Sequence, residues 1–212
     1  MKITVDLRGL DEVQAKLRRL PGELQDRAAA LAINKTAAKA NTELTRAIVS
    51  EFAIDRASVR NSVQIGRASA KRAGQVTATI NIFGSARRRG RSLNVAHFLE
   101  KSISLAESRR RIKKGTLYAQ GRGGRLLPVL GFRFKKGGGV KNIEGAFLGN
   151  RGRTVFVRTG NSRLPIKPVQ MIGISQMFTT TGIRRRVMDR IDRELVVETD
   201  RAVKLLMERA FG

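Results

Sequence analysis

ELQDRAAALAINKTAAKANTELTRAIVS, residues 23–50, is rich in alanine and contains neither glycine nor proline. Alanine is the strongest helix former, so an uninterrupted run of this length predicts one long helix. At 1.5 Å per residue this helix would be about 40 Å long. Its apolar stripe starts at Leu24, Ala28 and Leu31 and continues, with some drift, at Ile33, Ala37, Leu44 and Ile48. The small alanine side chains would let other helices approach closely.

The two ends of the chain predict further helices. Residues 10–20, LDEVQAKLRRL, place leucines and a valine on one side of a helix, at Leu10, Val13, Leu17 and Leu20. Pro21 and Gly22 end this helix because proline cannot continue the hydrogen-bond ladder. After Gly182 a second long helix is predicted by apolar residues near helical spacing, at Ile183, Val187, Ile191, Leu195, Ala202 and Leu206.

Shorter elements are predicted between these helices. Residues 3–7 predict a short strand, and Asp55 is a candidate N-cap for a short helix over 56–62. In GQVTATINIF (74–83), apolar residues at Val76, Ala78, Ile80 and Ile82 alternate with polar ones, which predicts a strand with one wet face. GAFLGNRGRTVFVRTG (145–160) predicts two short strands joined at an NRG turn. LPIKPVQMIGIS (164–175) continues as a strand whose two prolines predict an edge position.

Residues 84–142 have a different composition, with arginine runs and the glycine-rich segments QGRGGR and KKGGGVK. Within them, Val95, Leu99, Ile103 and Ala106 would align on a helix. Arg109–Arg111 would stand at its end, where positive charge favours the helix dipole. We expect the rest to form loops or an arm. The predicted class is α+β, with long N-terminal and C-terminal helices around a small, mainly antiparallel sheet. We expect one domain over 1–212, with the basic insertion or arm at about 84–142.

The formal net charge is +26, from 43 Lys and Arg residues against 17 Asp and Glu. Residues 56–188 hold 29 of the basic residues and only three acids, Glu100, Glu107 and Glu144, so this block carries the whole net charge. The two flanks together are neutral. Such a block repels itself, and we expect it to face an anionic partner in its working state.

The composition also limits which reactive groups the protein can use and in which cellular compartment we expect it. The chain has no cysteine, which removes disulfides, thiolate nucleophiles and Cys-based zinc sites. Asp6 and Arg8 interrupt the start where a signal peptide would need an apolar run, and no stretch approaches the roughly 20 apolar residues of a membrane span. We therefore expect a protein made and kept in a cytosol-like compartment, without a membrane partner.

The sequence offers only weak candidates for catalytic or metal-binding residues. The lone His97 cannot build a two-histidine metal site, and on the predicted helix it would neighbour Lys101. Glu100 and Glu107 would share a helical face and could bind Mg²⁺ as a nuclease does, but the surrounding arginines favour ion pairs. The glycine-rich segments match neither phosphate-loop pattern. We predict that the protein is not an enzyme and has no catalytic, cofactor-binding or metal site.

The arginine and lysine runs are the candidate contact residues for an anionic partner. They are Arg87, Arg88, Arg89, Arg91, Arg109, Arg110, Arg111, Lys113, Lys114, Lys135 and Lys136. Two interpretations stay open, contact with DNA phosphates and docking on acidic neighbours in an assembly. Base-stacking aromatics are nearly absent from this region, which disfavours sequence-specific RNA reading.

Two stretches resemble the phage minor tail protein Z family. ALAINKTAAKA (30–40) followed by FAIDRASVR (52–60) is similar to its N-terminal helix and short basic helix. GGGVKNIEGAFLGNRGRTVFVRTGNSRLPIKPVQ (137–170) resembles a second block, with a glycine-rich lead, GAF, a turn, an aromatic strand with a basic end, and R-x-P-I. The likeness covers about two-thirds of the chain and departs from it across 84–125.

The resemblance implies a structural virion protein at the head-proximal end of the tail, present in the host cytoplasm during assembly. It would complete the tail for head–tail joining and position the DNA end. Related tail-completion proteins form rings at the neck, commonly six-fold, so the implied partners include further copies of the chain in a hexamer. The other implied partners are the tail terminator, tail tube and neck proteins, with duplex DNA or the tape-measure protein as further candidates.

Within the second block, Phe147, Phe156 and Arg158 are the candidate subunit-interface residues, because aromatic and arginine side chains dominate interface energetics. Simple core packing of Phe147 and Phe156 is the alternative. For the whole chain, the alternative function is a non-enzymatic nucleic-acid-binding protein of ribosomal or nucleoid type, since Arg-Gly-rich arms occur there. Against it stand the charge-neutral flanks, whose apolar helices are typical of protein contacts.

Overall fold

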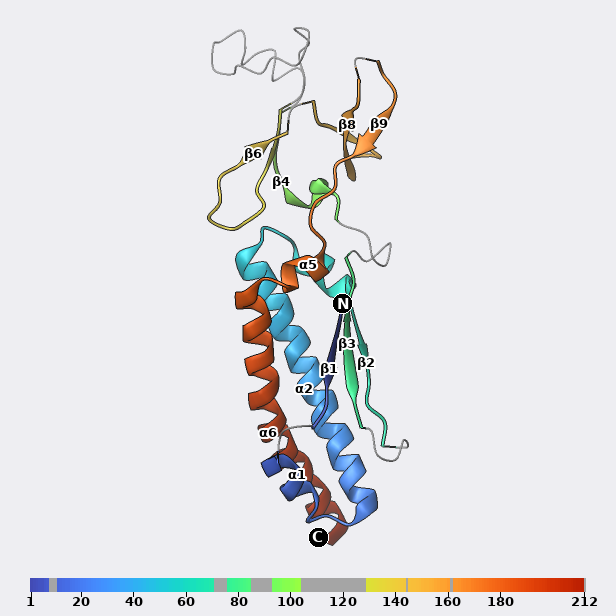
Figure 1. Ribbon diagram of the computed structural model, residues 1–212, viewed down its shortest axis with the longest axis vertical. Helices are drawn as coiled ribbons and strands as arrows, with labels where there is room; N and C mark the ends of the chain where they lie inside the picture. Colours follow the sequence, from blue (N-terminus) through green and yellow to red (C-terminus); the bar gives the residue numbers. More distant parts are fainter. Residues whose placement is uncertain are drawn as a thin grey trace. The chain divides into compact units, whose positions relative to one another are not determined.

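A computed structural model describes residues 1–7, 11–70, 76–84, 93–103, 129–143, 145–160 and 162–211. The chain divides into two compact units (Figure 1). Unit 1 comprises Met1–Ile48, Arg56–Gly90 and Ile174–Gly212, and unit 2 comprises Val49–Asp55 and Arg91–Gly173. Long helices and small antiparallel sheets confirm the α+β class. The single domain over 1–212 stays a prediction.

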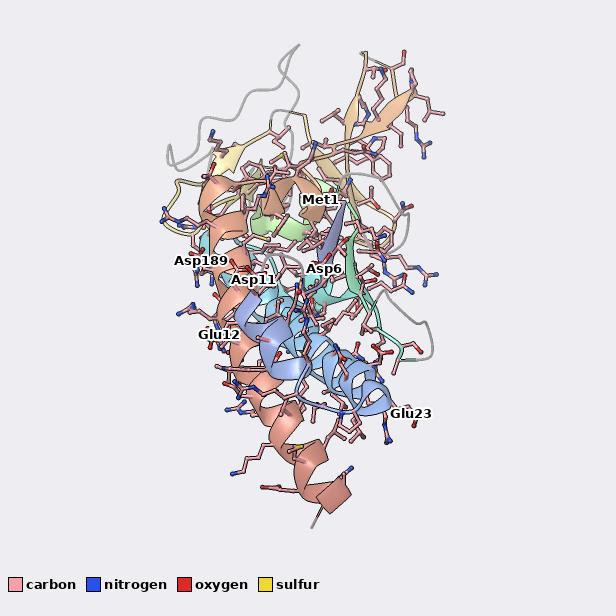
Figure 2. The ribbon with its side chains drawn as sticks, turned by 60° about the horizontal axis from the view of Figure 1, so that its bottom comes forward. Met1, Asp6, Asp11, Glu12, Glu23 and Asp189 are labelled. Atoms are coloured by element: carbon pink, nitrogen blue, oxygen red, sulfur yellow. The ribbon has the colours of Figure 1, made fainter. Side chains whose placement is uncertain are left out.

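The helices of unit 1 begin and end close to where the sequence predicts. They are α1 (Asp11–Leu17), α2 (Gly22–Glu51, whose last residues enter unit 2), α3 (Arg56–Asn61), α5 (Ile174–Phe178) and α6 (Thr181–Phe211). In Figure 2, Asp11 and Glu12 lie at the start of α1 and Glu23 at the start of α2. Acidic groups there favour the positive end of the helix dipole.

Helix α2 is buried around most of its circumference. Its buried residues include Ala28, Ala32, Ile33, Ala37 and Ile48, which do not share one narrow stripe. A helix with neighbours on two sides has this pattern, because each neighbour covers its own face. The predicted stripe is wrong at Leu31, which remains 38% exposed, since the alanines around it carry the contacts instead.

The sheet of unit 1 has the strand order β1-β3-β2 and is antiparallel. Its strands are β1 (Lys2–Val5), β2 (Val63–Gly66) and β3 (Ala78–Ile82). Ala78, Ile80 and Ile82 are buried and alternate with half-buried polar residues, which confirms the predicted alternation. The N-terminal ammonium donates to the carbonyl oxygen of Ile82 at 2.8 Å, and the strand predicted over 3–7 ends at Val5.

Helix α6 confirms the predicted C-terminal helix. Its six predicted apolar positions are all buried: Ile183, Val187, Ile191, Leu195, Ala202 and Leu206. The last two join a core cluster with Val13 and Leu17 of α1 and with alanines of α2. The helical spacing of the sequence therefore identifies the apolar part of the packing face of α6, which also includes the buried Glu198 and Thr199.

Unit 2 contains a short 3-10 helix, η1 (Val95–Phe98), and two three-stranded antiparallel sheets. One has the order β4-β5-β6, formed by β4 (Leu99–Ile103), β5 (Val129–Phe132) and β6 (Lys141–Asn142). The other has the order β7-β8-β9, formed by β7 (Phe147–Gly149), β8 (Thr154–Arg158) and β9 (Ile166–Pro168). Strand β9 lies at the edge, as its prolines predict.

The helix predicted through Val95, Leu99 and Ile103 is wrong. One 3-10 turn is followed by β4, in which Leu99 pairs with Phe132 of β5. A spacing of four fits one face of a strand as well as one face of a helix, and strand pairing decides between them. Residues 129–132 and 141–142, which we expected in loops, are strands for the same reason. Ala106 and Arg109–Arg111 lie outside the described residues.

The strand predicted over 164–175 is too long. It ends at Pro168, and Ile174–Phe178 form α5. The amide of Val169 still donates to the carbonyl oxygen of Val155 at 2.9 Å, but the amide of Val155 donates to Asn94 Oδ1 and not to the edge strand, so the regular pairing stops there. The amide of Ile174 donates instead to the carbonyl oxygen of Gly84 at 3.1 Å, within unit 1.

A buried carboxylate links α2 and α6 in unit 1. Glu198 is only 1% exposed and accepts from Lys39 and from Arg201, the latter at 2.6 Å. Lys39 also donates to Glu194. Burial by itself raises the pKa of Glu198, but hydrogen bonds and charges of Lys39 and Arg201 outweigh it, and the pKa lies below its ordinary value. A buried charge of this kind needs both partners, since removing one leaves it uncompensated.

We predict that Glu198→Gln removes a pH-dependent part of the stability. Because the folded-state pKa is lowered, the ionised carboxylate contributes stability above the unfolded-state pKa of about 4.5, and this is lost as the pH falls through the folded-state pKa. The difference in free energy of unfolding between wild type and variant should therefore shrink in acid. Urea denaturation followed by circular dichroism, from about pH 7 to about pH 3, measures it.

The matched control is Glu208→Gln on the same helix. Glu208 is exposed and stands 3.9 Å from Lys204, so its loss should leave the stability nearly unchanged at every pH. A wild-type advantage over Glu198→Gln that stays constant in acid would contradict the assignment.

Candidate interaction surfaces

The β7–β8 hairpin is closed by the predicted NRG turn. Asn150, Arg151 and Gly152 have φ values of 50°, 57° and 81°. Asparagine and glycine adopt this left-handed region more readily than other residues, which explains why the turn forms at this tripeptide. The turn places Phe147 opposite Phe156 and Gly149 opposite Thr154.

Asn94 fixes the hairpin to the rest of unit 2. Its Oδ1 accepts from the amides of Ala96 and Val155, both at 2.9 Å, and its Nδ2 donates to the carbonyl oxygen of Val155 at 3.3 Å. Asn94 thus caps η1 and holds β8 with the same side chain. The sequence analysis missed this residue, although an asparagine directly before a helical turn is a recognisable N-cap signal.

The β7-β8-β9 sheet has two faces of different character. Val155 is buried in a core cluster with Val95, Leu130 and Phe132, and Leu148 and Val157 pack against this cluster. Successive residues of a strand point to opposite faces, so Phe147, Phe156 and Arg158 lie on the other face. Strand pairing adds Ile166 and Pro168 of β9 to that face.

We call the second face, made by Phe147, Gly149, Thr154, Phe156, Arg158, Ile166 and Pro168, the aromatic face. The rings of Phe147 and Phe156 stack with centroids 6.0 Å apart and planes at 29°. The guanidinium carbon of Arg158 lies 4.6 Å from the Phe147 centroid, within range of a cation–π interaction. Both rings are half-buried and face away from the cluster around Val155. This geometry brings together the three residues that the sequence predicts as interface residues.

Gly149 makes room for this arrangement. A Cβ atom at Gly149 would lie 2.8 Å from Cε2 and 2.9 Å from Cδ2 of Phe156. Real Cβ atoms do not approach ring carbons this closely, so the Phe156 ring lies over the glycine because no side chain occupies that space.

All charged residues in the segment that carries the aromatic face are basic. Residues 145–173 contain five cationic residues and no acid: Arg151, Arg153, Arg158, Arg163 and Lys167. In the described part of the chain, none of the five forms an ion pair. All five are exposed, so their charges face solvent or a partner.

The structure describes only two of the predicted anionic-contact residues, Lys135 and Lys136. Lys135 is 3.2 Å from Glu51 and lies 5.8 Å from the Phe52 centroid, so its charge is already engaged within unit 2. Lys136 is exposed, and its backbone amide donates to Glu51. The remaining candidates lie outside the described residues: Arg87, Arg88, Arg89, Arg91, Arg109, Arg110, Arg111, Lys113 and Lys114.

Of the carboxylates considered for a metal site, the structure describes only Glu100. Glu100 lies in β4 and accepts from Arg133 through both oxygens, at 2.5 and 2.9 Å, which confirms the ion-pair interpretation for this residue. The predicted helical face shared by Glu100 and Glu107 is wrong, because Glu100 is in a strand. The predicted helical placement of His97 beside Lys101 is also wrong, because Lys101 belongs to the same strand. Glu107 and Glu144 lie outside the described residues. Among the residues that are described, no three histidine or acidic side chains are grouped to hold a metal ion.

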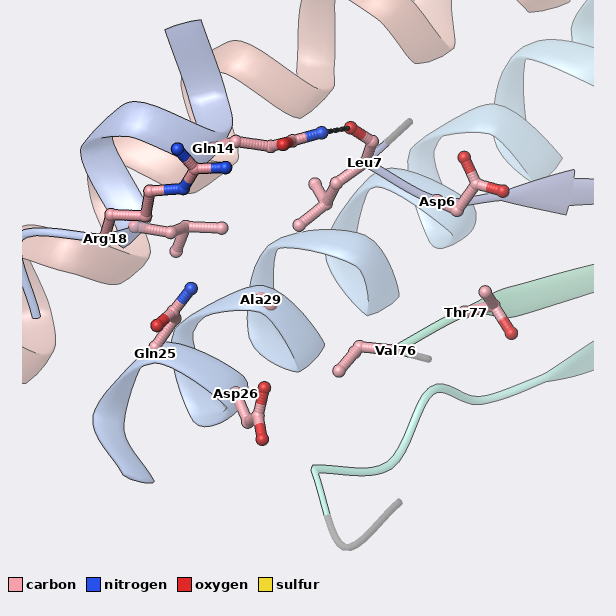
Figure 3. Close-up of a pocket in the computed structure, with 10 residues that line it drawn as sticks. Asp6, Leu7, Gln14, Arg18, Gln25, Asp26, Ala29, Val76 and Thr77 are labelled. Atoms are coloured by element: carbon pink, nitrogen blue, oxygen red, sulfur yellow. Dashed lines mark hydrogen bonds between the residues drawn. The ribbon is translucent and has the colours of Figure 1, made fainter. Parts of the chain in front are cut away.

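Unit 1 contains a pocket of about 320 Å³ (Figure 3). Asp6, Asp26, Gln14, Gln25 and Arg18 supply most of its polar lining. Gln14 is held in place because its Nε2 donates to the carbonyl oxygen of Leu7 at 2.9 Å. None of the predicted contact residues lines this pocket.

The described residues thus present a stacked aromatic pair with exposed cations on the same segment, and no grouped metal ligands. A comparison with protein-family models identifies the class, since the model of the prophage minor tail protein Z family matches residues 7–209. The chain belongs to this family and is therefore a phage tail structural protein. A search of curated proteins and a search of solved structures both find no match. In the described part of the chain, no helix is both long and apolar enough to span a bilayer.

We predict that Gly149→Ala displaces the Phe156 ring and destabilises unit 2 by about 1–3 kcal/mol, the usual cost of forcing an extra carbon into a packed site. Chemical denaturation measures the cost, and the NMR signals of the Phe147 and Phe156 rings report the displacement. Gly160→Ala is the control, because a Cβ atom there meets nothing within 4 Å. Equal stability of the two variants would show that the ring contact is not needed.

Proposed function

We propose that this tail protein completes the tail at its head-proximal end, where it is required for head–tail joining and for positioning the DNA end. Membership of the minor tail protein Z family supports a place in the virion and contacts with other tail components. The charge supports the neck in particular, because the DNA end and the surrounding tail proteins are lasting neighbours there. The same membership favours a tail role over a ribosomal or nucleoid one.

We propose further that the protein acts as a hexameric ring. The observation behind this is the charge of +26 per copy, so six copies would carry +156. A closed ring of such subunits repels itself unless polyanions neutralise it. Duplex DNA in the bore, the tape-measure protein, and the tail terminator, tail tube and neck proteins are the proposed partners. The predicted runs at Arg87–Arg89 and Arg109–Arg111 are proposed to make these anionic contacts.

The test replaces Arg87–Arg89 and Arg109–Arg111 together with Ser in the phage that encodes the protein. Removing six charges from each copy should leave tails that fail to join heads, and should flatten the salt dependence with which the purified protein binds duplex DNA. Electron microscopy of lysates counts joined particles, and filter binding over a salt series measures the slope.

The control removes six exposed arginines from unit 1, each outside the ion pairs described above: Arg19, Arg27, Arg56, Arg60, Arg67 and Arg184. Joining by the first variant at the wild-type level would overturn the assignment of the two arginine runs. Infectious particles from a phage that lacks the gene altogether would overturn the proposed function itself.

A further inference from the structure

The aromatic face is apolar at its centre and lies on the side of the sheet that does not pack on the core of unit 2. Phe147 and Phe156 could have pointed into unit 2, where Val155 and its neighbours form a core, but the strand register places them on the opposite side. Gly149 has no side chain, so the Phe156 ring packs directly over it, and the guanidinium of Arg158 lies over the Phe147 ring. Stacked aromatic rings beside an arginine are the side chains that contribute most at protein interfaces.

The surroundings of this face select the charge of its partner. Arg151 and Arg153 stand in and beside the hairpin turn and Arg163 in the β8–β9 connection, whereas Lys167 lies on the opposite face of the edge strand. With Arg158, these arginines place four cations on the aromatic face or in the loops at its ends, on one short segment that has no acid. An apolar centre with a rim of one sign binds best to a surface whose rim has the opposite sign.

A second copy of the chain does not provide that rim. Two aromatic faces in contact would bring four cations against four, and like charges across an interface oppose binding. The acids of the chain lie almost entirely in its two flanks, which together hold as many basic as acidic residues. Several of these acids are already paired, such as Glu43 with Arg186, Glu194 with Arg190 and Glu198 with Arg201. The flanks of a second copy therefore offer the rim no net negative charge.

Nucleic acid fits the rim but not the centre. Single-stranded nucleic acid uses aromatic rings whose faces are free for bases, whereas here the rings stack on each other and Arg158 occupies a face of Phe147. Duplex phosphates make no use of a half-buried apolar centre that includes Ile166 and Pro168. The apolar centre and the basic rim together point to protein.

We propose that the aromatic face docks on a different virion protein, one that presents an apolar patch within an acidic rim. This rests on the role of the chain in the tail, and it assigns to Phe147, Phe156 and Arg158 a neighbouring tail protein in place of the subunit contact expected from the sequence. The ring and its partner would then use separate surfaces of the same chain.

Site-specific photo-crosslinking in complete virions tests this proposal. Pro168 is exposed and pairs with Phe156 on the aromatic face, whereas its neighbour Lys167 pairs with Val157 on the opposite face. Benzoylphenylalanine at position 168 should form an adduct with one other virion protein, through a peptide that carries an acidic surplus. The same probe at position 167 is the matched control and should lose most of that adduct, because its side chain faces away from the proposed partner.

Charge reversal shows whether the rim contributes. Arg151→Glu, Arg153→Glu and Arg163→Glu together should reduce the adduct from position 168 by about tenfold or more, because attraction becomes repulsion. Arg56→Glu, Arg60→Glu and Arg67→Glu change the charge equally in unit 1 and should leave the yield unchanged. Thermal unfolding of both triple variants verifies that each is folded.

The outcomes separate this inference from the proposed function. An adduct at position 168 with a second copy of the chain, with DNA alone, or with no molecule at all would overturn the docking proposal while heads and tails still join. An adduct with another protein that survives reversal of the rim would also overturn it. If purified virions contain no copy of the chain, the proposed function fails instead.

Discussion

Uncompensated positive charge between residues 56 and 188 is the constraint on which this protein depends. Part of the charge of unit 1 is paired internally, and Glu198 is buried there because Lys39 and Arg201 neutralise it. The segment 145–173 has no acid with which to do the same. On the β7-β8-β9 sheet only another molecule can therefore supply the missing negative charge.

Unpaired positive charge beside an aromatic pair suits a protein that assembles into a tail. Assembly in a fixed order needs surfaces that are stable alone yet bind strongly once the correct neighbour arrives. Unsatisfied like charge keeps copies of the chain from docking through the wrong face, and it attracts acidic partners over a distance set by the salt concentration. The aromatic pair adds short-range contact energy that charge alone does not provide, so the two features together give selectivity and strength.

Sequence reasoning succeeded where one period dominated. In the C-terminal run the step of seven residues from Leu195 to Ala202 fits a helix face and not a strand face, and the alternation of Ala78, Ile80 and Ile82 fits only a strand, so both were predicted correctly. At Val95, Leu99 and Ile103 the spacing of four fits both periods, and a helix was predicted where β4 pairs with β5. Asn94 was missed because its value lies in holding Val155, which is 61 residues away in the chain.

The sequence by itself determined the class of the fold, the long helices and the position of the charge, because these depend on local spacing and composition. It also contained the residues of the aromatic face. Only the tertiary structure decided that Phe147 and Phe156 stand outside the core, since the register of β7 on β8 assigns every side chain to one face or the other. The local turn pairs the two strands, but Val95, Leu130 and Phe132, which are distant in sequence, decide which face of the hairpin is buried.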